Sequence, residues 1–196
     1  MLNYGEEIAY WYLRFNGFFL IDNFVIHHSK NVKHSSDIDI IAVRLPYVYE
    51  EIGGHPNDWD TSFFDPFNKN LPIGVLCEIK TGRIDIKKLF KPDNIKYAIG
   101  RFGFARNFEE TNLVSDVDEQ KLIHRDEFQI AKILFSNRKH LDNDRFYHCP
   151  LSHLQEFLQK RIKLYKEKYQ DRMFFSSNLM QYLIDSEQKK RTTGVR

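Results

Sequence analysis

Hydrophobic and polar positions follow two different periods in the first part of the chain. Apolar residues recur every three to four positions over residues 3–16, which predicts a helix that Asn3 would cap and Gly17 would end. Residues 18–27 are rich in aromatic and β-branched side chains and predict a strand. Residues 28–36 are polar and predict a turn before the next strand.

Two further predicted strands carry charged residues at matched spacing. Residues 37–45 place Asp39 on the face opposite their apolar side chains, and residues 73–81 place Glu78 and Lys80 together on one face. Charged groups in an apolar strand are costly unless they are paired or bind something. Carboxylates and a lysine converging from two strands would suit a magnesium-dependent phosphodiesterase site.

The remaining pattern predicts an α/β protein in which helices flank a mixed sheet. Between the two acid-bearing strands, residues 46–72 combine Gly, Pro and Asn with six aromatic residues. They predict an inserted loop, either functional or held to the surface by those aromatics. We expect one domain over residues 1–188, with a core over about 4–150. The other expected elements are a helical turn over 85–90, helices over 93–103, 152–168 and 178–188, strands over 126–136 and 145–149, and a basic flexible tail over 189–196.

Composition narrows the class of protein. The chain has 196 residues and 42% hydrophobic residues, enough for a substantial core. Its net charge is only +2, so any nucleic-acid contact would depend on local patches. The two cysteines do not imply a disulfide framework, and Cys77 is expected to be a small core residue. With no signal-peptide pattern and no apolar run of membrane-spanning length, the expected protein is soluble and cytoplasmic and has no membrane partner.

Three motifs occur in the order of a known superfamily. They are Gly5-Glu6-x-x-Ala9-x-x-x-Leu13-x-x-x-Gly17-Phe18, Asp37-Ile38-Asp39-Ile40-Ile41-Ala42 and Glu78-Ile79-Lys80-Thr81. This combination resembles the PD-(D/E)XK nucleases of the restriction-endonuclease-like fold, in particular the YraN-like and Holliday-junction-resolvase-like branches. The resemblance covers about residues 4–105. It implies a metal-dependent endonuclease that hydrolyses DNA in repair, recombination or defence against foreign DNA.

The resemblance also implies a role for each matched residue. Asp39 and Glu78 would bind Mg²⁺, for which Mn²⁺ would substitute, and the carbonyl of Ile79 would complete the protein ligands. Lys80 would orient or deprotonate the attacking water or stabilise charge on the phosphate. Glu6 would reach the site from the first helix, as a ligand through water or by orienting a ligand.

Several basic residues follow the second acid-bearing strand and are candidate DNA contacts. In this fold the helix after that strand often flanks the site and meets the phosphate backbone. The basic face of the helix over 152–168 is either a nucleic-acid footprint or a solvated surface. Dimerisation is common in this fold because two strands need cutting, so a homodimer is among the expectations. The candidate contacts are Lys96, Arg101, Arg83, Lys87 and Lys88.

Other interpretations stay open. The charged cluster could be a structural ion-pair network at a sheet edge, or the protein could be a non-catalytic nucleic-acid-binding or assembly module on the same fold. RNA is a further candidate substrate. Asp37 would either orient Asp39 or face solvent. His27, His28 and His34 fit no closed zinc site and are expected to be loop or surface residues.

Overall fold

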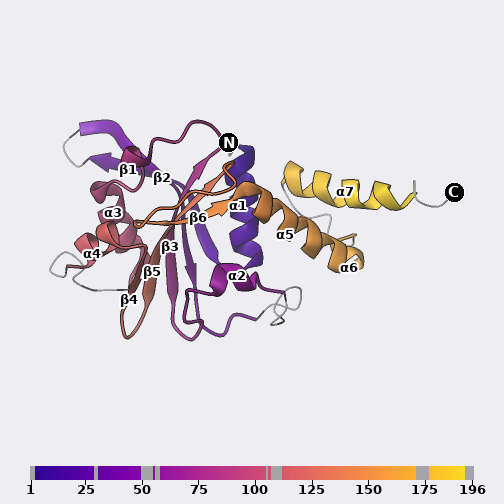
Figure 1. Ribbon diagram of the computed structural model, residues 1–196, viewed down its shortest axis with the longest axis horizontal. Helices are drawn as coiled ribbons and strands as arrows, with labels where there is room; N and C mark the ends of the chain where they lie inside the picture. The colour runs from indigo at the N-terminus through magenta and orange to yellow at the C-terminus, as the bar shows by residue number, and fades with distance from the viewer. Residues whose placement is uncertain are drawn as a thin grey trace.

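The computed structural model of the chain contains one sheet with helices on both faces (Figure 1). The backbone is described for residues 3–28, 31–49, 55, 58–104, 106, 112–170 and 177–192, and the side chains of residues 24–28, 31–37, 170 and 188–192 lie outside that description. The elements are α1 (Tyr4–Phe15), β1 (Phe19–His28), β2 (Asn31–Arg44), α2 (Thr61–Phe64), β3 (Ile73–Lys80), η1 (Ile86–Lys88), α3 (Pro92–Phe102), α4 (Leu113–Glu119), β4 (Leu122–His124), β5 (Gln129–Ser136), β6 (Tyr147–Pro150), α5 (Leu151–Leu164), α6 (Lys166–Gln170) and α7 (Asn178–Thr192).

The described strands form a mixed six-stranded sheet. Its order is β1-β2-β3-β5-β4, and β6 pairs with β5. β1, β2 and β3 are antiparallel in succession, whereas β5 runs parallel to both β3 and β6. The connection from β3 to β5 includes α3 and α4, because parallel neighbours need a crossover. The predicted α/β class, with a mixed sheet and C-terminal helices, is confirmed.

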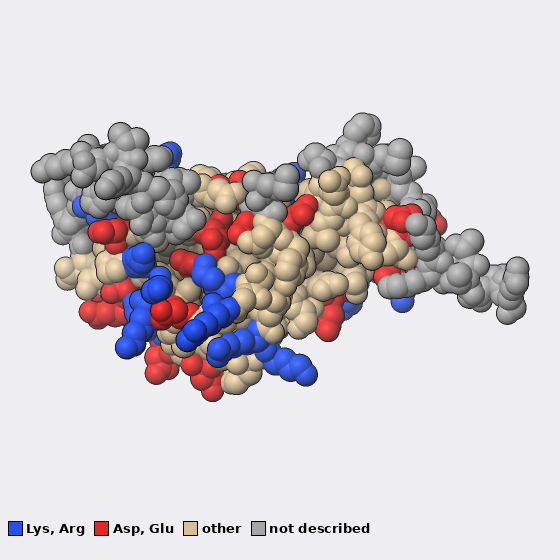
Figure 2. All heavy atoms as spheres, turned by 90° about the horizontal axis from the view of Figure 1, so that it is seen from above, with Lys and Arg blue, Asp and Glu red and all other residues tan. Residues whose placement is uncertain are grey.

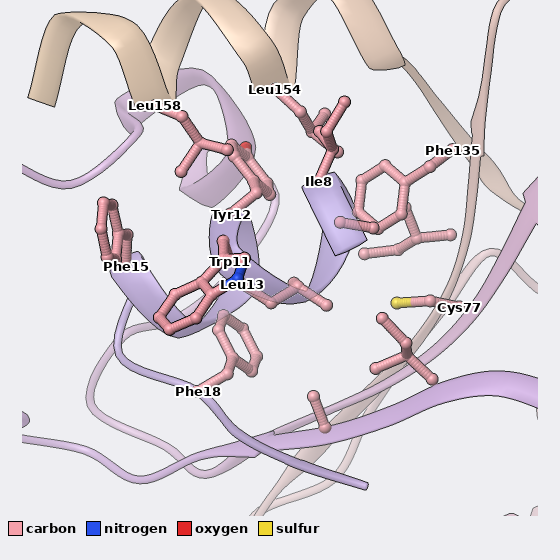
Figure 3. Close-up of a cluster of buried hydrophobic side chains, with 14 of the residues drawn as sticks. Ile8, Trp11, Tyr12, Leu13, Phe15, Phe18, Cys77, Phe135, Leu154 and Leu158 are labelled. Carbon is pink, nitrogen blue, oxygen red and sulfur yellow. The ribbon is translucent and has the colours of Figure 1, made fainter. Parts of the chain in front are cut away.

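Each face of the sheet is covered by its own hydrophobic cluster. On one face α1 lies between α5, which contributes Leu154 and Leu158, and the strand that carries Cys77 (Figure 3). On the other face, residues of α3 and α4 pack around Leu76 of β3. Because both faces are covered, nearly every residue of β3 is buried, and Cys77 is the buried core residue that the sequence predicted.

The inserted segment between β2 and β3 is fixed partly by its aromatic residues. Trp59, Phe64 and Phe67 are buried in the same cluster as α1, whereas Tyr47 and Tyr49 are exposed. Asp60 caps α2 and connects the segment to α1, since the Tyr12 hydroxyl donates a hydrogen bond to its carboxylate. For these three buried aromatics, the structure agrees with the interpretation that they hold the insertion against the protein.

Several predicted boundaries are wrong. The segment 28–36 is mostly strand rather than turn, because β2 begins at Asn31 and pairs with β1 along this stretch. α4 and β4 were not predicted, since each is short. The single helix predicted over 152–168 is divided at Tyr165 into α5 and α6. α7 continues to Thr192, four residues into the predicted flexible tail.

Lys132 of β5 is fully buried, which is rare for a lysine. Its ammonium donates a hydrogen bond of 2.5 Å to the Asp118 carbonyl and lies 5.9 Å from the centre of the Phe90 ring. Burial, reinforced by the nearby Arg145 charge and opposed by Asp118, lowers the pKa of Lys132 to about 8. These contacts hold the ammonium in place, but burial makes its protonated form less favourable than it is in water.

This lowered pKa predicts a specific pH dependence of stability. Between about pH 8 and about pH 10.5 the unfolded chain keeps the Lys132 proton while the folded protein has lost it, so the free energy of unfolding should rise with pH. Urea denaturation across this window should show the rise in the wild type and a smaller one in Lys132→Met. Other titrating groups contribute to the pH dependence of both proteins, so only the difference between the two reports Lys132. Identical pH dependences would contradict the prediction.

Candidate functional site

Asp39, Glu78 and Lys80 meet on one face of the sheet. The Lys80 ammonium lies 3.0 Å from Asp39 Oδ2 and 2.7 Å from Glu78 Oε2, so it bridges the two carboxylates. The side chains of Asp39 and Glu78 are 14% and 7% exposed, whereas that of Lys80 is 32% exposed and gives the cluster its contact with solvent. The structure therefore brings together the three residues that the sequence singled out.

The cluster forms where β2 and β3 stop pairing through their backbones. The register between the strands ends at Ile40 opposite Cys77, and beyond it the Asp39 carboxylate accepts the Ile79 backbone N–H at 2.6 Å. The neighbouring Lys80 carbonyl faces the other way and accepts the Asn137 N–H of the β5 end. Because successive strand carbonyls point to opposite sides, the Ile79 carbonyl faces the same gap as Asp39.

Burial and neighbouring charges both shift the pKa values of Glu78 and Lys80. Burial, reinforced by the charge of Asp39, raises the pKa of Glu78 even though Lys80 and a hydrogen bond from the Phe90 backbone N–H favour its ionised form. Burial also acts to lower the pKa of Lys80, but the attraction of Glu78 and Asp39 outweighs it, and the pKa is raised. The ammonium is thus held in its charged form by the two carboxylates.

Phe90 is a part of the site that the sequence did not reveal. Its φ of 52° is unusual for a bulky residue, and its ring is buried. Its backbone N–H donates to the Glu78 carboxylate. Strained backbone of this kind persists where the surrounding structure fixes it, often at functional sites. No feature of the sequence near residue 90 marks a left-handed conformation, so only the structure could show this contact.

Glu6 lies on α1 but does not join the acidic pair. Its carboxylate accepts hydrogen bonds from the backbone and side-chain amides of Asn3, and so completes the capping box at the start of the helix. No group of three or more His, Cys, Asp or Glu side chains placed to hold a metal occurs among the described residues. In the structure Glu6 caps the start of α1, and its predicted role at the site stays a prediction.

Gly5 nevertheless places the start of α1 directly against the end of β3. A Cβ atom at Gly5 would lie 2.5 Å from Thr81 Cγ2 and 3.2 Å from Ile79 Cγ2. We expect Gly5→Ala to force α1 away from β3 and to lower the free energy of unfolding by about 1–3 kcal/mol. Gly5→Ala/Thr81→Ser should recover much of this loss, since serine lacks the methyl group. Thermal denaturation of both variants is the measurement, and an equally unstable double variant would contradict the explanation.

The predicted DNA contacts are exposed and lie on the segments that follow β3. They are on the approach to η1, on η1 itself and on α3, and Lys88 is 3.6 Å from Asp85. Figure 2 shows Lys and Arg side chains gathered on one part of the surface with acidic side chains among them. The surface is therefore mixed in charge rather than uniformly basic. The five exposed residues are Arg83, Lys87, Lys88, Lys96 and Arg101.

The structure gives less functional information about the other candidates from the sequence. Arg161 belongs to the helix whose basic face was a candidate nucleic-acid surface, but it is buried, and its guanidinium packs against Phe15, Phe157 and Tyr165. It therefore stabilises the packing of α5 rather than forming a surface charge. The side chains of four candidates, Asp37, His27, His28 and His34, lie outside the described residues.

A cavity of about 660 Å³ lies on the other side of the sheet from the charged cluster. Its lining includes Tyr12, Phe63, Ile133 and His153, extends to His148 of β6, and contains none of the three charged residues. Ile133 and Tyr12 belong to the hydrophobic cluster of α1 and α5. The charged cluster is therefore a separate site on the opposite face, where β2 and β3 stop pairing, and it reaches solvent through Lys80.

The donors at the cluster fit a divalent cation of the magnesium type. Two carboxylates and one carbonyl supply hard oxygen ligands, and Mg²⁺ commonly keeps several waters in addition to one or two protein carboxylates. Asp39, Glu78 and the carbonyl of Ile79 are the groups that would hold it. The fit does not require Glu6.

Comparisons with family models, with curated proteins and with solved structures find no match to this chain. What the structure defines is an α/β protein with a mixed sheet and an Asp-Glu-Lys cluster at the point where two strands separate. Among the described residues, no helix is long and apolar enough to cross a membrane.

Proposed function

We propose that this protein is a metal-dependent endonuclease that hydrolyses DNA phosphodiester bonds and has a restriction-endonuclease-like core. The observation that supports it is the meeting of Asp39, Glu78 and Lys80 beyond the last paired residues of β2 and β3. Two nearly buried carboxylates that share one ammonium are costly as a purely structural device. They are well suited to binding a cation next to a phosphate.

Each residue has a distinct task in the proposed reaction. Asp39, Glu78 and the Ile79 carbonyl would hold Mg²⁺ or Mn²⁺, which would supply Lewis acidity towards the phosphate and the attacking water. Lys80 would orient that water or stabilise the charge that develops on the phosphate. The backbone N–H groups of Ile79 and Phe90 fix the orientations of Asp39 and Glu78 respectively. The exposed cations on η1 and α3 would contact the DNA backbone.

A second candidate function is a nucleic-acid-binding or assembly module without catalysis. One observation favours it, because the Lys80 ammonium already neutralises both carboxylates and leaves the cluster balanced without a metal. The two functions differ in what Lys80 does. Lys80→Ala should abolish cleavage and leave DNA binding intact if the protein is a nuclease, whereas a binding module cleaves nothing in either form.

The proposal is tested by cleavage assays with Mg²⁺ or Mn²⁺ on supercoiled, single-stranded, flap and four-way-junction DNA and on RNA. Asp39→Ala, Glu78→Ala and Lys80→Ala should each lose metal-dependent cleavage. The control is Asp144→Asn, which alters a fully exposed carboxylate. Equal cleavage by all proteins would indicate a contaminant, and no cleavage by folded wild type that binds DNA would favour the binding module.

A further inference from the structure

The carboxyl ends of β3, β5 and β6 lie at the same end of the sheet, which is the end that carries the charged cluster. The register places Lys80 opposite Ser136, and Ser136 opposite Pro150. One row further in, Glu78 is opposite Leu134, and Leu134 is opposite His148. Directly opposed residues of parallel strands face the same side of a sheet, so His148 lies on the face of Glu78, about 10 Å away over two strand spacings.

The end of β5 is tied to both neighbouring strands. The Asn137 side-chain amide donates to the Thr81 carbonyl at 2.7 Å and to the Tyr4 hydroxyl at 2.8 Å. On the other side the Ser136 hydroxyl is 2.8 Å from Nε2 of His148 and accepts the Arg138 backbone N–H at 3.3 Å. These contacts hold the start of the segment 137–140 beside the charged cluster.

This segment carries three successive basic side chains, Arg138, Lys139 and His140, all exposed. His140 is 3.1 Å from Asp142, which is a local counter-charge. For the Arg138 guanidinium the structure shows no hydrogen-bond or ion-pair partner among the described residues. Burial, and then the charges of His140 and Arg138, lower the pKa of His148. His148 is therefore neutral near pH 8, whereas the Arg138 guanidinium keeps its charge.

We infer that Arg138 and His148 form a phosphate-binding subsite, which takes a backbone phosphate of a nucleic-acid strand that passes the Asp39–Glu78–Lys80 cluster. The inference rests on the proposed function and adds a second surface to it, at the carboxyl end of β5 and β6 instead of on η1 and α3. About 10 Å separates the two sites, and each strand of a duplex carries one phosphate per 3.4 Å of axis, so one strand can contact both. Arg138 would supply the charge, and His148, whose Nε2 contacts Ser136, would donate a hydrogen bond through its other ring nitrogen.

The test is binding of a fluorescein-labelled DNA duplex to the full chain in EDTA at pH 8, measured by fluorescence anisotropy over a range of salt concentrations. Arg138→Gln should weaken binding about tenfold and reduce the slope of log K against log[salt] by about one. His148→Gln should weaken binding without changing the slope, because the imidazole is uncharged at this pH. The matched control is Lys69→Gln, an exposed cation just before β3 at the opposite end of that strand.

Several outcomes would overturn the inference. Arg138→Gln binding with wild-type affinity and salt slope would do so, as would an equal loss in Lys69→Gln. Inorganic phosphate titrated against the His148 NMR signals separates a small-anion site from a polynucleotide site. Shifts with phosphate but no DNA binding would exclude the polynucleotide. Thermal melts of each variant establish that it is folded.

The binding test stands apart from the test of catalysis. Binding in EDTA needs no hydrolysis, so binding can be measured whether or not the Asp39–Glu78–Lys80 cluster cleaves DNA. If the wild type cleaves DNA and Arg138→Gln binds normally, only the subsite is wrong. If the wild type never cleaves but Arg138→Gln loses binding with the expected salt slope, the subsite is supported and the endonuclease proposal fails.

Discussion

Glu78→Gln is expected to reduce metal-dependent cleavage by about 10³-fold while the folded protein is at least as stable as the wild type at neutral pH. The loss follows from replacing a carboxylate ligand by an amide, which binds a hard cation weakly. The stability follows from the raised pKa of Glu78, which shows that burial disfavours its ionised form in the folded state. Glutamine has the same shape and keeps an oxygen that can accept the Phe90 N–H.

Cleavage rate and melting temperature should be measured on the same preparations. Glu119→Gln is a suitable control, because Glu119 is exposed on α4 and its carboxylate accepts a hydrogen bond from the Ser115 hydroxyl one turn earlier. A structural ion-pair cluster gives the opposite pattern, since breaking it would lower the melting temperature. Glu78→Gln that cleaves at the wild-type rate would exclude Glu78 as a metal ligand.

Asp60→Asn is expected to lower the free energy of unfolding by about 3 kcal/mol, the largest stability effect that we predict for a single side chain. The Asp60 carboxylate accepts hydrogen bonds from the Tyr12 and Ser62 hydroxyls, each at 2.6 Å, and lies 2.5 Å from Nε2 of His153. Asparagine has one acceptor oxygen and adds two donors to a group of donors. The buried Tyr12 hydroxyl would then compete for a single acceptor.

Urea denaturation checks this expectation, with two comparisons. Ser62→Ala removes a hydrogen bond from an exposed residue and should cost about 1 kcal/mol or less. A double-mutant cycle of Asp60→Asn with Tyr12→Phe should show strong coupling between the two residues, because Tyr12→Phe removes the donor that Asp60→Asn leaves unpaired. Additive losses in the cycle would show that the contact between them contributes little.

The same carboxylate predicts how stability depends on acid. Burial acts to raise the pKa of Asp60, but hydrogen bonds from Ser62, Tyr12 and His153 outweigh it, and the pKa is lowered from 3.8. A carboxyl with a lowered folded-state pKa stabilises the protein above its unfolded pKa. That stabilisation is lost as the pH falls below about 4. The wild type should therefore lose more stability than Asp60→Asn over this acidic range.

How well the sequence predicts an element depends on the strength of its local signal. Strong local signals, such as the Asn3 cap and the alternation around Glu78, correctly predicted α1 and β3. Weak or short signals failed for α4 and β4, which are short, and for the polar start of β2, although both strand segments pair with a strand only a few residues away. Glu6 was assigned to the site by motif, but it is close enough to Asn3 for a capping box, which is a purely local contact.

The sequence by itself determined which face of each acid-bearing strand carries charge, because side-chain direction in a strand depends only on the parity of the position. It therefore named Asp39, Glu78 and Lys80 as a group. Only the tertiary structure decided that β2 and β3 separate after Ile40 and Cys77, so that Asp39 turns to the Ile79 N–H. Only the fold of the segment after β3 brought Phe90 to Glu78, and only the pairing of β6 with β5 brought His148 to the same end of the sheet, since side-chain parity does not determine either contact.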